Sequence, residues 1–198
     1  FTEKRLLVAT HNAGKLDEMR ALLAPYGVEV VGAAEMGLAE PVETEDSFIG
    51  NARIKARAAV EATGLPVLAD DSGITVDALD GAPGVYTADW AETGHGRDFP
   101  MAMARTWSEL LATGSAAPFH AQFRCTLVLM WPDGHDETFE GVLPGQVVWP
   151  PGAEVHGDDP VFQPDGHDVT LGEMSAEMKN SLSHRSRAMQ QLVEKVLG

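Results

Sequence analysis

Two adjacent carboxylates, Asp70 and Asp71, directly follow the short apolar run 67–69 and precede Ser72 and Gly73. Like charges this close raise the pKa of one carboxyl group unless a cation or hydrogen-bond donors hold both. A hard divalent metal with oxygen ligands would account for the pair economically. Because aspartate is also common in turns, simple capping of a turn is an equal alternative for these residues taken alone.

The chain has only five lysines, and three of them lie on or beside polar ends of predicted elements: Lys15, Lys55 and Lys179. Lys15 falls in the first turn of a predicted helix, where the helix dipole disfavours a cation unless an anion docks there. A solvated Lys15 is the alternative. Cations for phosphates together with carboxylates for a metal indicate chemistry on a magnesium-bound polyphosphate.

The elements that position these residues can be read from capping and periodicity. Residues 5–10 predict a buried strand, and Asn12 is a good N-cap for a helix over 13–23. A second helix is predicted from Ser47 to about residue 63, where Gly64 stops it. Asn51 and Lys55 are four residues apart and therefore share one face of that helix, although a solvated polar stripe would give the same spacing.

The remaining pattern predicts an α/β fold with a mixed sheet, because helices and strands alternate at first and a hairpin follows. The region 65–88 predicts a strand, an acidic turn and a second strand. Ser183 is predicted to cap the last helix, with His184 and Arg185 in its first turn. The other predictions are a strand at 28–31, a helix from Asp98 to Gly114 with Met103, Trp107, Leu110 and Leu111 buried, a strand at 119–131, a return strand near 137–142, a strand at 147–149 and a short helix at 170–173.

Composition limits the classes of partner. The length of 198 residues predicts one globular domain. The net charge of -16 argues against a nucleic-acid polymer or an anionic membrane as partner, because both require a basic surface. No run is long enough for a membrane span, and residues 6–9 are too short for a signal peptide. The single cysteine, Cys125, excludes an internal disulfide and fits a reducing cytoplasm.

Four blocks together resemble the inosine/xanthosine triphosphate pyrophosphatase family. They are ATHNAGK (9–15), SFIGNARIKA (47–56), LADDSGITVDALDGAPGVY (68–86) and KNSLSHR (179–185), and their order and spacing also match. The resemblance runs over nearly the whole chain. It implies one domain over 1–198, with an elongated mixed sheet flanked by helices and two lobes separated by a cleft. It also implies a cytoplasmic, Mg2+-dependent homodimer that hydrolyses ITP, dITP and XTP to the monophosphate and pyrophosphate.

The resemblance also implies roles for individual residues. Asp71 matches the acid that activates the attacking water, and Glu43, Asp70 and Asp71 match the metal ligands. The positions that match substrate contacts are Thr10, His11, Asn12, Ala13, Gly14, Lys15, Lys55, Ser72, His156, Gly157, Asp158, Asp159, Lys179, His184 and Arg185.

Some positions depart from the family pattern. His11 replaces a usual glycine, Gly50 a usual glutamate and Ser186 a usual glycine. In the block VHGDDPVF, His156 and Asp158 stand at usual aromatic positions. His156 can still stack on the base, whereas Asp158 cannot and adds negative charge near the polyphosphate, which predicts a weaker affinity for substrate. A pyrophosphatase for other modified nucleotides and a nucleotide-binding regulator without catalysis are the alternative functions.

Overall fold

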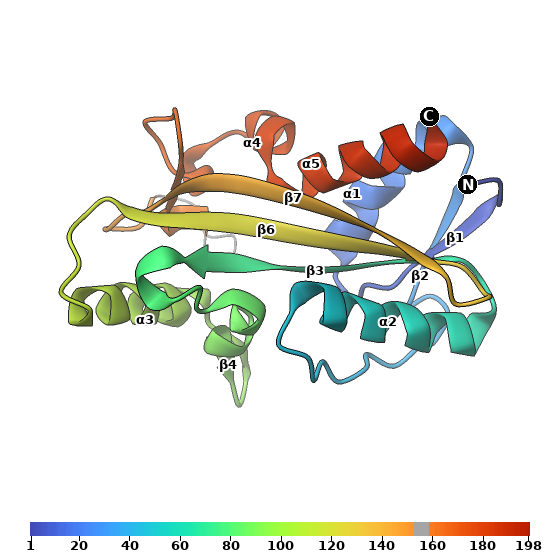
Figure 1. Ribbon diagram of the computed structural model, residues 1–198, viewed down its shortest axis with the longest axis horizontal. Coiled ribbons are helices and arrows are strands. Elements are labelled where there is room, and N and C mark those ends of the chain that lie inside the picture. The colour runs from blue at the N-terminus through green and yellow to red at the C-terminus, as the bar shows by residue number, and fades with distance from the viewer. Residues whose placement is uncertain (153–158) are drawn as a thin grey trace. The chain divides into compact units, whose positions relative to one another are not determined.

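The computed structural model describes residues 1–152 and 159–198 (Figure 1). The helices are α1 (Ala13–Leu23), α2 (Phe48–Thr63), α3 (Phe99–Ala112), α4 (Ala176–Leu182) and α5 (His184–Leu192). The strands are β1 (Arg5–Val8), β2 (Glu29–Gly32), β3 (Val67–Val76), β4 (Glu92–Thr93), β5 (Gly96–Arg97), β6 (Phe119–Met130), β7 (Asp136–Val147) and β8 (Phe162–Pro164). No helix within the described ranges combines the length and apolar character needed to cross a membrane.

The main sheet has six strands in the order β2-β1-β3-β6-β7-β8. β1 pairs in parallel with both β2 and β3, whereas β7 and β8 are antiparallel. Parallel pairs at one end and an antiparallel pair at the other make the sheet mixed, which confirms the predicted α/β class. The residues divide into two compact units, of which the first comprises Phe1–Asp71, Cys125–Glu140 and Ala188–Gly198 and the second Ser72–Arg124 and Gly141–Arg187.

In the first unit, helices cover both faces of the sheet. Leu6 and Val8 of β1 pack with Met19 of α1 and Met189 of α5, while the intervening Leu7 packs with the alanines of α2. This alternation follows from the two-residue repeat of a strand. Figure 1 accordingly shows α2 on the face of these strands opposite to α1 and α5. Cys125 is buried in this core, as predicted.

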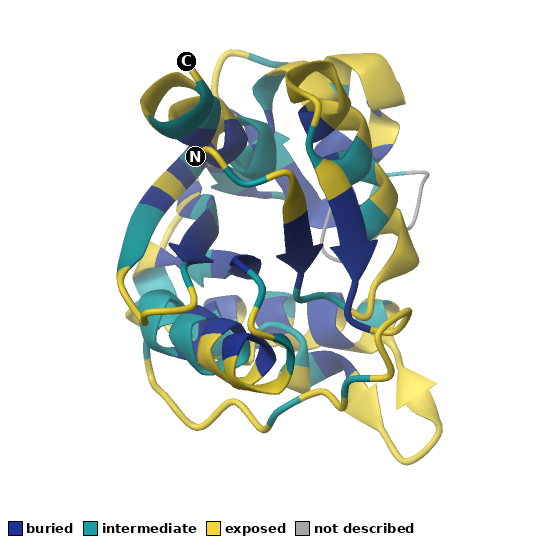
Figure 2. Ribbon diagram, turned by 90° about the vertical axis from the view of Figure 1, so that its right-hand side faces the viewer, coloured by how far each residue is buried: buried dark blue, intermediate teal, exposed yellow. Residues whose placement is uncertain are grey.

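The second unit has its own apolar core. Phe119 and Phe123 of β6 pack with Phe162 of β8 and with Met103 and Leu110 of α3. Figure 2 shows the buried residues gathered on strands and on inward helix faces, with exposed residues on the outer helix faces and loops. Leu111 was predicted to be buried but is 59% exposed, because α3 turns it away from the side that carries Leu110.

Gly145 marks a close approach of β7 to β8, and we expect Gly145→Ala to lower the free energy of unfolding by about 2–3 kcal/mol. A Cβ at this position would meet the backbone oxygen of Gln163 and lie 2.7 Å from the ring of Phe162, so neither neighbour could accommodate it without movement. Urea unfolding would measure the loss. Gly94→Ala is the matched control, since its Cβ would enter open space; an equal loss in both variants would contradict the packing argument.

Two sequence predictions about strands were wrong. The expected turn at Asp70–Gly73 does not exist: β3 continues through it as one ten-residue strand. Tertiary partners of the two carboxylates, described below, hold them within the strand. No separate strand forms at 147–149: Val147 is the last residue of β7, and residues 148 and 149 lie outside any strand.

Candidate active site

Asp70 and Asp71 are buried in the middle of β3, where their exposed fractions are only 2% and 8%. Both carboxylates lie within the electrostatic reach of Lys55, and Asp70 also pairs with Lys15. Burying two ionised groups in this way is costly unless each is compensated. The compensation comes from two lysines on two different helices.

Lys15 compensates Asp70. Its Nζ lies 2.9 Å from Oδ2 of Asp70, and this pair joins the first turn of α1 to β3. Asn12 begins the helix as predicted, because its side-chain oxygen accepts a hydrogen bond of 3.1 Å from the backbone nitrogen of Lys15. The anion that the sequence predicted beside this lysine is therefore present within the chain itself, as the carboxylate of Asp70.

Lys55, which lies on α2, compensates Glu43 and Asp71. Its Nζ lies 2.9 Å from Oε1 of Glu43, in the segment that precedes the helix. Burial lowers the pKa of Lys55, but the negative charges of Asp70 and Glu43 outweigh this effect, and the resulting pKa lies above the ordinary value. Lys55 is thus a fully charged ammonium group among three carboxylates.

Asp71 has the most perturbed titration of the group. Burial, together with the charges of Glu43 and Asp70, raises its pKa to about 7, although Lys55 and a hydrogen bond from Asn51 act in the opposite direction. Its Oδ2 atom is buried and accepts no hydrogen bond from any described residue. A carboxylate with a pKa near neutrality and an unused acceptor atom has the properties of a general base.

The loop between β1 and α1 supplies the phosphate-binding candidates Thr10–Lys15. Thr10 Oγ1 accepts a hydrogen bond of 3.1 Å from the backbone nitrogen of Asn12, which shapes the turn. His11, Asn12, Ala13 and Gly14 are exposed at the N-terminus of the helix. Exposed backbone N–H groups at a helix N-terminus are suited to binding an anion.

The first unit therefore brings together Lys15, Glu43, Lys55, Asp70 and Asp71, which the sequence had singled out. It also contributes Asn51, which sequence reasoning placed on the Lys55 face but did not include in the site. The only available signal was the four-residue spacing. Ser72, Lys179, His184 and Arg185 belong to the second unit.

In the second unit, Lys179 lies in the last turn of α4, and His184 and Arg185 begin α5. Ser183 caps α5 as predicted, with its Oγ accepting from the backbone nitrogen of Ser186 at 3.1 Å. The His184 ring stacks on Phe123 with a centroid distance of 5.0 Å. His156, Gly157 and Asp158 lie outside the described residues, and Asp159 is described only as the first residue of a short 3-10 turn.

The carboxylates of Glu43, Asp70 and Asp71 also make this site the candidate metal centre. No group of three or more His, Cys, Asp and Glu side chains within residues 1–152 and 159–198 has the arrangement of a ready-made metal site. Magnesium, however, binds through one or two carboxylates with the rest of its shell from water and phosphate. The unused Oδ2 of Asp71, beside Asp70 and Glu43, fits such a partial ligand set.

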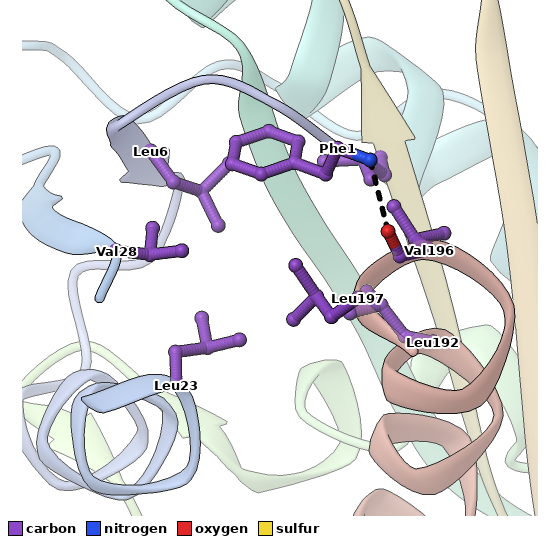
Figure 3. A pocket seen from close by; sticks show the side chains of 8 residues that line it. Phe1, Leu6, Leu23, Val28, Leu192, Val196 and Leu197 are labelled. Carbon is purple, nitrogen blue, oxygen red and sulfur yellow. Dashed lines mark hydrogen bonds between the residues drawn. The ribbon is translucent and has the colours of Figure 1, made fainter. Parts of the chain in front are cut away.

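A separate apolar pocket in the first unit is not suited to binding a nucleotide (Figure 3). The terminal amine of Phe1 donates a hydrogen bond of 2.9 Å to the backbone oxygen of Val196 beside it. The side chains that line it are those of Phe1, Leu6, Leu23, Val28, Leu129, Leu192, Val196 and Leu197. It has no polar side chain to orient a nucleotide.

Comparison with known proteins places this geometry in a family. The family model described as the Ham1 family matches residues 6–195. The chain belongs to the Ham1 family. This Ham1-family chain is 65% identical over 199 residues to a protein named dITP/XTP pyrophosphatase from Ruegeria pomeroyi, covering 100% of this chain and 98% of that protein. A protein of the same name from Zymomonas mobilis is 54% identical, with coverage of 96% and 90%.

Solved structures agree with the fold. A HAM1 protein from Coxiella burnetii superimposes with a TM-score of 0.92 at 32% identity, covering 98% of this chain and 99% of that one. A structure titled nucleoside-triphosphatase and dITP/XTP pyrophosphatase, from Mycobacterium abscessus, gives a TM-score of 0.80 at 38% identity, covering 96% and 98%. These matches confirm the family resemblance that the sequence blocks indicated.

Proposed function

We propose that this Ham1-family chain hydrolyses non-standard purine nucleoside triphosphates, such as dITP, ITP and XTP, to the monophosphate and pyrophosphate. One observation carries the proposal: Asp71 is a buried carboxylate with a pKa of about 7, under the influence of Lys55, which pairs with Glu43, and next in sequence to Asp70, which pairs with Lys15. The names of the relatives from Ruegeria pomeroyi and Zymomonas mobilis support the substrate class.

Asp71 is the proposed general base. A water molecule that attacks the α-phosphorus must lose a proton, and the Asp71 carboxylate would accept it. With a pKa of about 7, Asp71 is largely ionised at slightly alkaline pH and still basic enough to take that proton. An aspartate with the ordinary pKa would be a much weaker base. The raised pKa is thus an advantage for this step.

The lysines are the proposed polyphosphate ligands. In the structure, Lys15 and Lys55 neutralise Asp70 and Glu43, so their charges are satisfied within the protein. A triphosphate carries more negative charge than either carboxylate, so both ammonium groups can exchange their carboxylate partners for phosphate oxygens. The exposed N-terminus of α1 adds backbone donors for the leaving pyrophosphate.

Magnesium is the proposed metal, held by Glu43, Asp70 and Asp71, which offer the oxygen ligands that it prefers. When bound, it would supply Lewis-acid stabilisation of the charge on the phosphate oxygens. Exchange of the lysines onto phosphate would release Asp70 and Glu43 for this role. The unused Oδ2 of Asp71 is consistent with it.

Lys179, His184 and Arg185 are the proposed base-recognition residues. Hypoxanthine and xanthine present a carbonyl acceptor at position 6, whereas adenine presents an amino donor. Protein donors such as Arg185 would therefore pair with the former and leave the amino group of ATP facing another donor. Unpaired polar groups of this kind can discriminate between substrates by orders of magnitude.

A substrate panel tests the proposal. With Mg2+ and a pyrophosphate readout, we expect kcat/KM for dITP, ITP and XTP to exceed that for ATP by at least about 100-fold. Faster turnover of dUTP or another modified pyrimidine nucleotide would favour the alternative pyrophosphatase. Nucleotide binding without any pyrophosphate release would favour the catalytically inactive regulator.

We also propose that the protein acts as a homodimer in the cytoplasm. The dimer is implied by the family resemblance, and the reducing compartment by the single cysteine, Cys125, which is buried. Light scattering on the purified chain would measure its mass in solution.

A further inference from the structure

Asn51 is a buried polar side chain, 2% exposed, that is hydrogen-bonded to the loop preceding α2. Its Oδ1 accepts a hydrogen bond of 2.9 Å from the backbone nitrogen of Glu45, and its Nδ2 donates one of 3.2 Å to the backbone oxygen of the same residue. The carboxamide thus pairs with both backbone groups of a single loop residue. Such a double contact fixes the orientation of that residue as well as its distance.

The segment that Asn51 holds is the one that carries Glu43. Residues 40–46 contain no helix or strand, and nearly all of them are exposed. The pair of Glu43 with Lys55 also attaches this segment to α2. Asn51 and Lys55 lie one turn apart on α2. This helix therefore binds the segment at two positions, Glu45 and Glu43.

Gly50 makes the close approach of this segment to α2 possible. A Cβ at position 50 would lie 2.8 Å from Cβ of Glu45 and 2.8 Å from Oγ of Ser47, both closer than real Cβ contacts. These atoms sit near the backbone and cannot swing away as the end of a flexible side chain could. A larger residue at position 50 would therefore displace Glu45.

Asn51 also lies close enough to the proposed general base to influence it, because its side chain lowers the pKa of Asp71. One side chain therefore connects Asp71 on β3 with the backbone of the segment that carries Glu43.

We propose that Asn51 is a positioning residue that fixes Glu43 relative to Asp71 by tethering the segment 40–46 to α2. This inference rests on the proposed function and assigns to Asn51 a part in that reaction. An amide placed here only to stabilise α2 would account for its burial. It would not account for the two hydrogen bonds to a loop residue outside the helix or for the effect on the pKa of Asp71.

The test combines kinetics with amide hydrogen exchange. We expect Asn51→Ala to lower kcat for dITP by about 10–100-fold, the usual effect of losing a residue that orients active-site ligands, while KM changes by less than about threefold. The amide of Glu45 should exchange at least about tenfold faster, because its acceptor is lost, while amides in the middle of α2 keep their protection.

Gly50→Ala is the second variant, and it leaves Asn51 in place. Alanine is the best helix former, so α2 is expected to persist while the new Cβ displaces Glu45. We expect the same loss of kcat and the same faster exchange at Glu45. Ser47→Ala is the control: it removes the N-cap bond of 3.1 Å to the backbone of Gly50 and weakens α2, but should leave kcat within about twofold.

The outcomes are separable. Unchanged exchange at Glu45 in Asn51→Ala, or a normal kcat in both variants, would overturn the inference, as would an equal loss of kcat in Ser47→Ala. If the wild-type protein turns over none of the nucleotides, the proposed function fails. The exchange comparison then still decides whether Asn51 holds the segment.

Discussion

Asp71→Asn is expected to lower kcat for dITP by about 1,000-fold, in the middle of the range for the loss of a general base. Asparagine has nearly the same volume and can still form hydrogen bonds, but its amide cannot accept the proton of the attacking water. Lys15, Lys55 and the N-terminus of α1 remain in place. Nucleotide affinity should therefore change by no more than a few fold, and the loss should appear in kcat.

Initial rates of pyrophosphate release at pH 8, together with calorimetric titration of dITP, would separate the two effects. Asp17→Asn is the matched control, since the side chain of Asp17 is 78% exposed and its contact with Arg20 is long, at 4.0 Å. Its kcat should stay within about twofold of the wild type. Residual activity of Asp71→Asn above a tenth of the wild-type rate would remove Asp71 from the role of base.

The helix boundaries were predictable from sequence because caps depend on residues one to three positions away. Asn12 and Ser47 accept the N-cap hydrogen bonds as expected, and Gly64 ends α2 in the left-handed conformation. Such interactions are complete within one turn of the helix, so no knowledge of the fold is needed to recognise them. The helix α4 was missed, since its seven residues are too few to show a clear apolar repeat.

The turn predicted at Asp70 and Asp71 was wrong because it was inferred from local preferences alone. Aspartate and glycine favour turns, and this preference predicted a turn at Asp70–Gly73. In the structure, Lys15 pairs with Asp70 across 55 positions of sequence, and Lys55 and Asn51 both lower the pKa of Asp71. These long-range contacts compensate the buried charges and allow β3 to continue. A local preference worth a fraction of a kcal/mol is easily overridden by such contacts.

The candidate site was partly predictable for a related reason. An unfavourable lysine at a helix N-terminus predicted an anion, but not which anion, because the sequence pattern does not reveal that β3 lies beside α1. Asn51 was harder still. Its partner is the backbone of Glu45, and backbone groups leave no residue-type signal in the sequence.

The second large effect concerns stability: in the absence of metal, Asp71→Asn should raise the free energy of unfolding at pH 8 by about 2–4 kcal/mol. The ordinary pKa of 3.8 rises to about 7 in the folded protein, mainly through burial. Each unit of difference between the folded and unfolded pKa corresponds to about 1.4 kcal/mol. Ionised Asp71 therefore destabilises the fold, and the neutral asparagine does not.

The sign of this effect fixes its dependence on pH. Below about pH 4, Asp71 is protonated in both states and costs nothing. Between pH 4 and pH 7, the unfolded chain loses the proton while the folded chain retains it, so stability falls as pH rises. Above pH 7, the full penalty is present. The advantage of Asp71→Asn should accordingly be near zero at pH 4, intermediate at pH 6 and largest at pH 8.

Urea unfolding with EDTA at these three pH values would measure the advantage, with Asp17→Asn as a control that should show none. A stabilisation that is equal at pH 4 and pH 8, or that falls with rising pH, would contradict the raised pKa of Asp71. The expected combination, in which one substitution removes turnover and increases stability, has a physical cause. The buried charge that destabilises the fold is the same charge that the reaction requires.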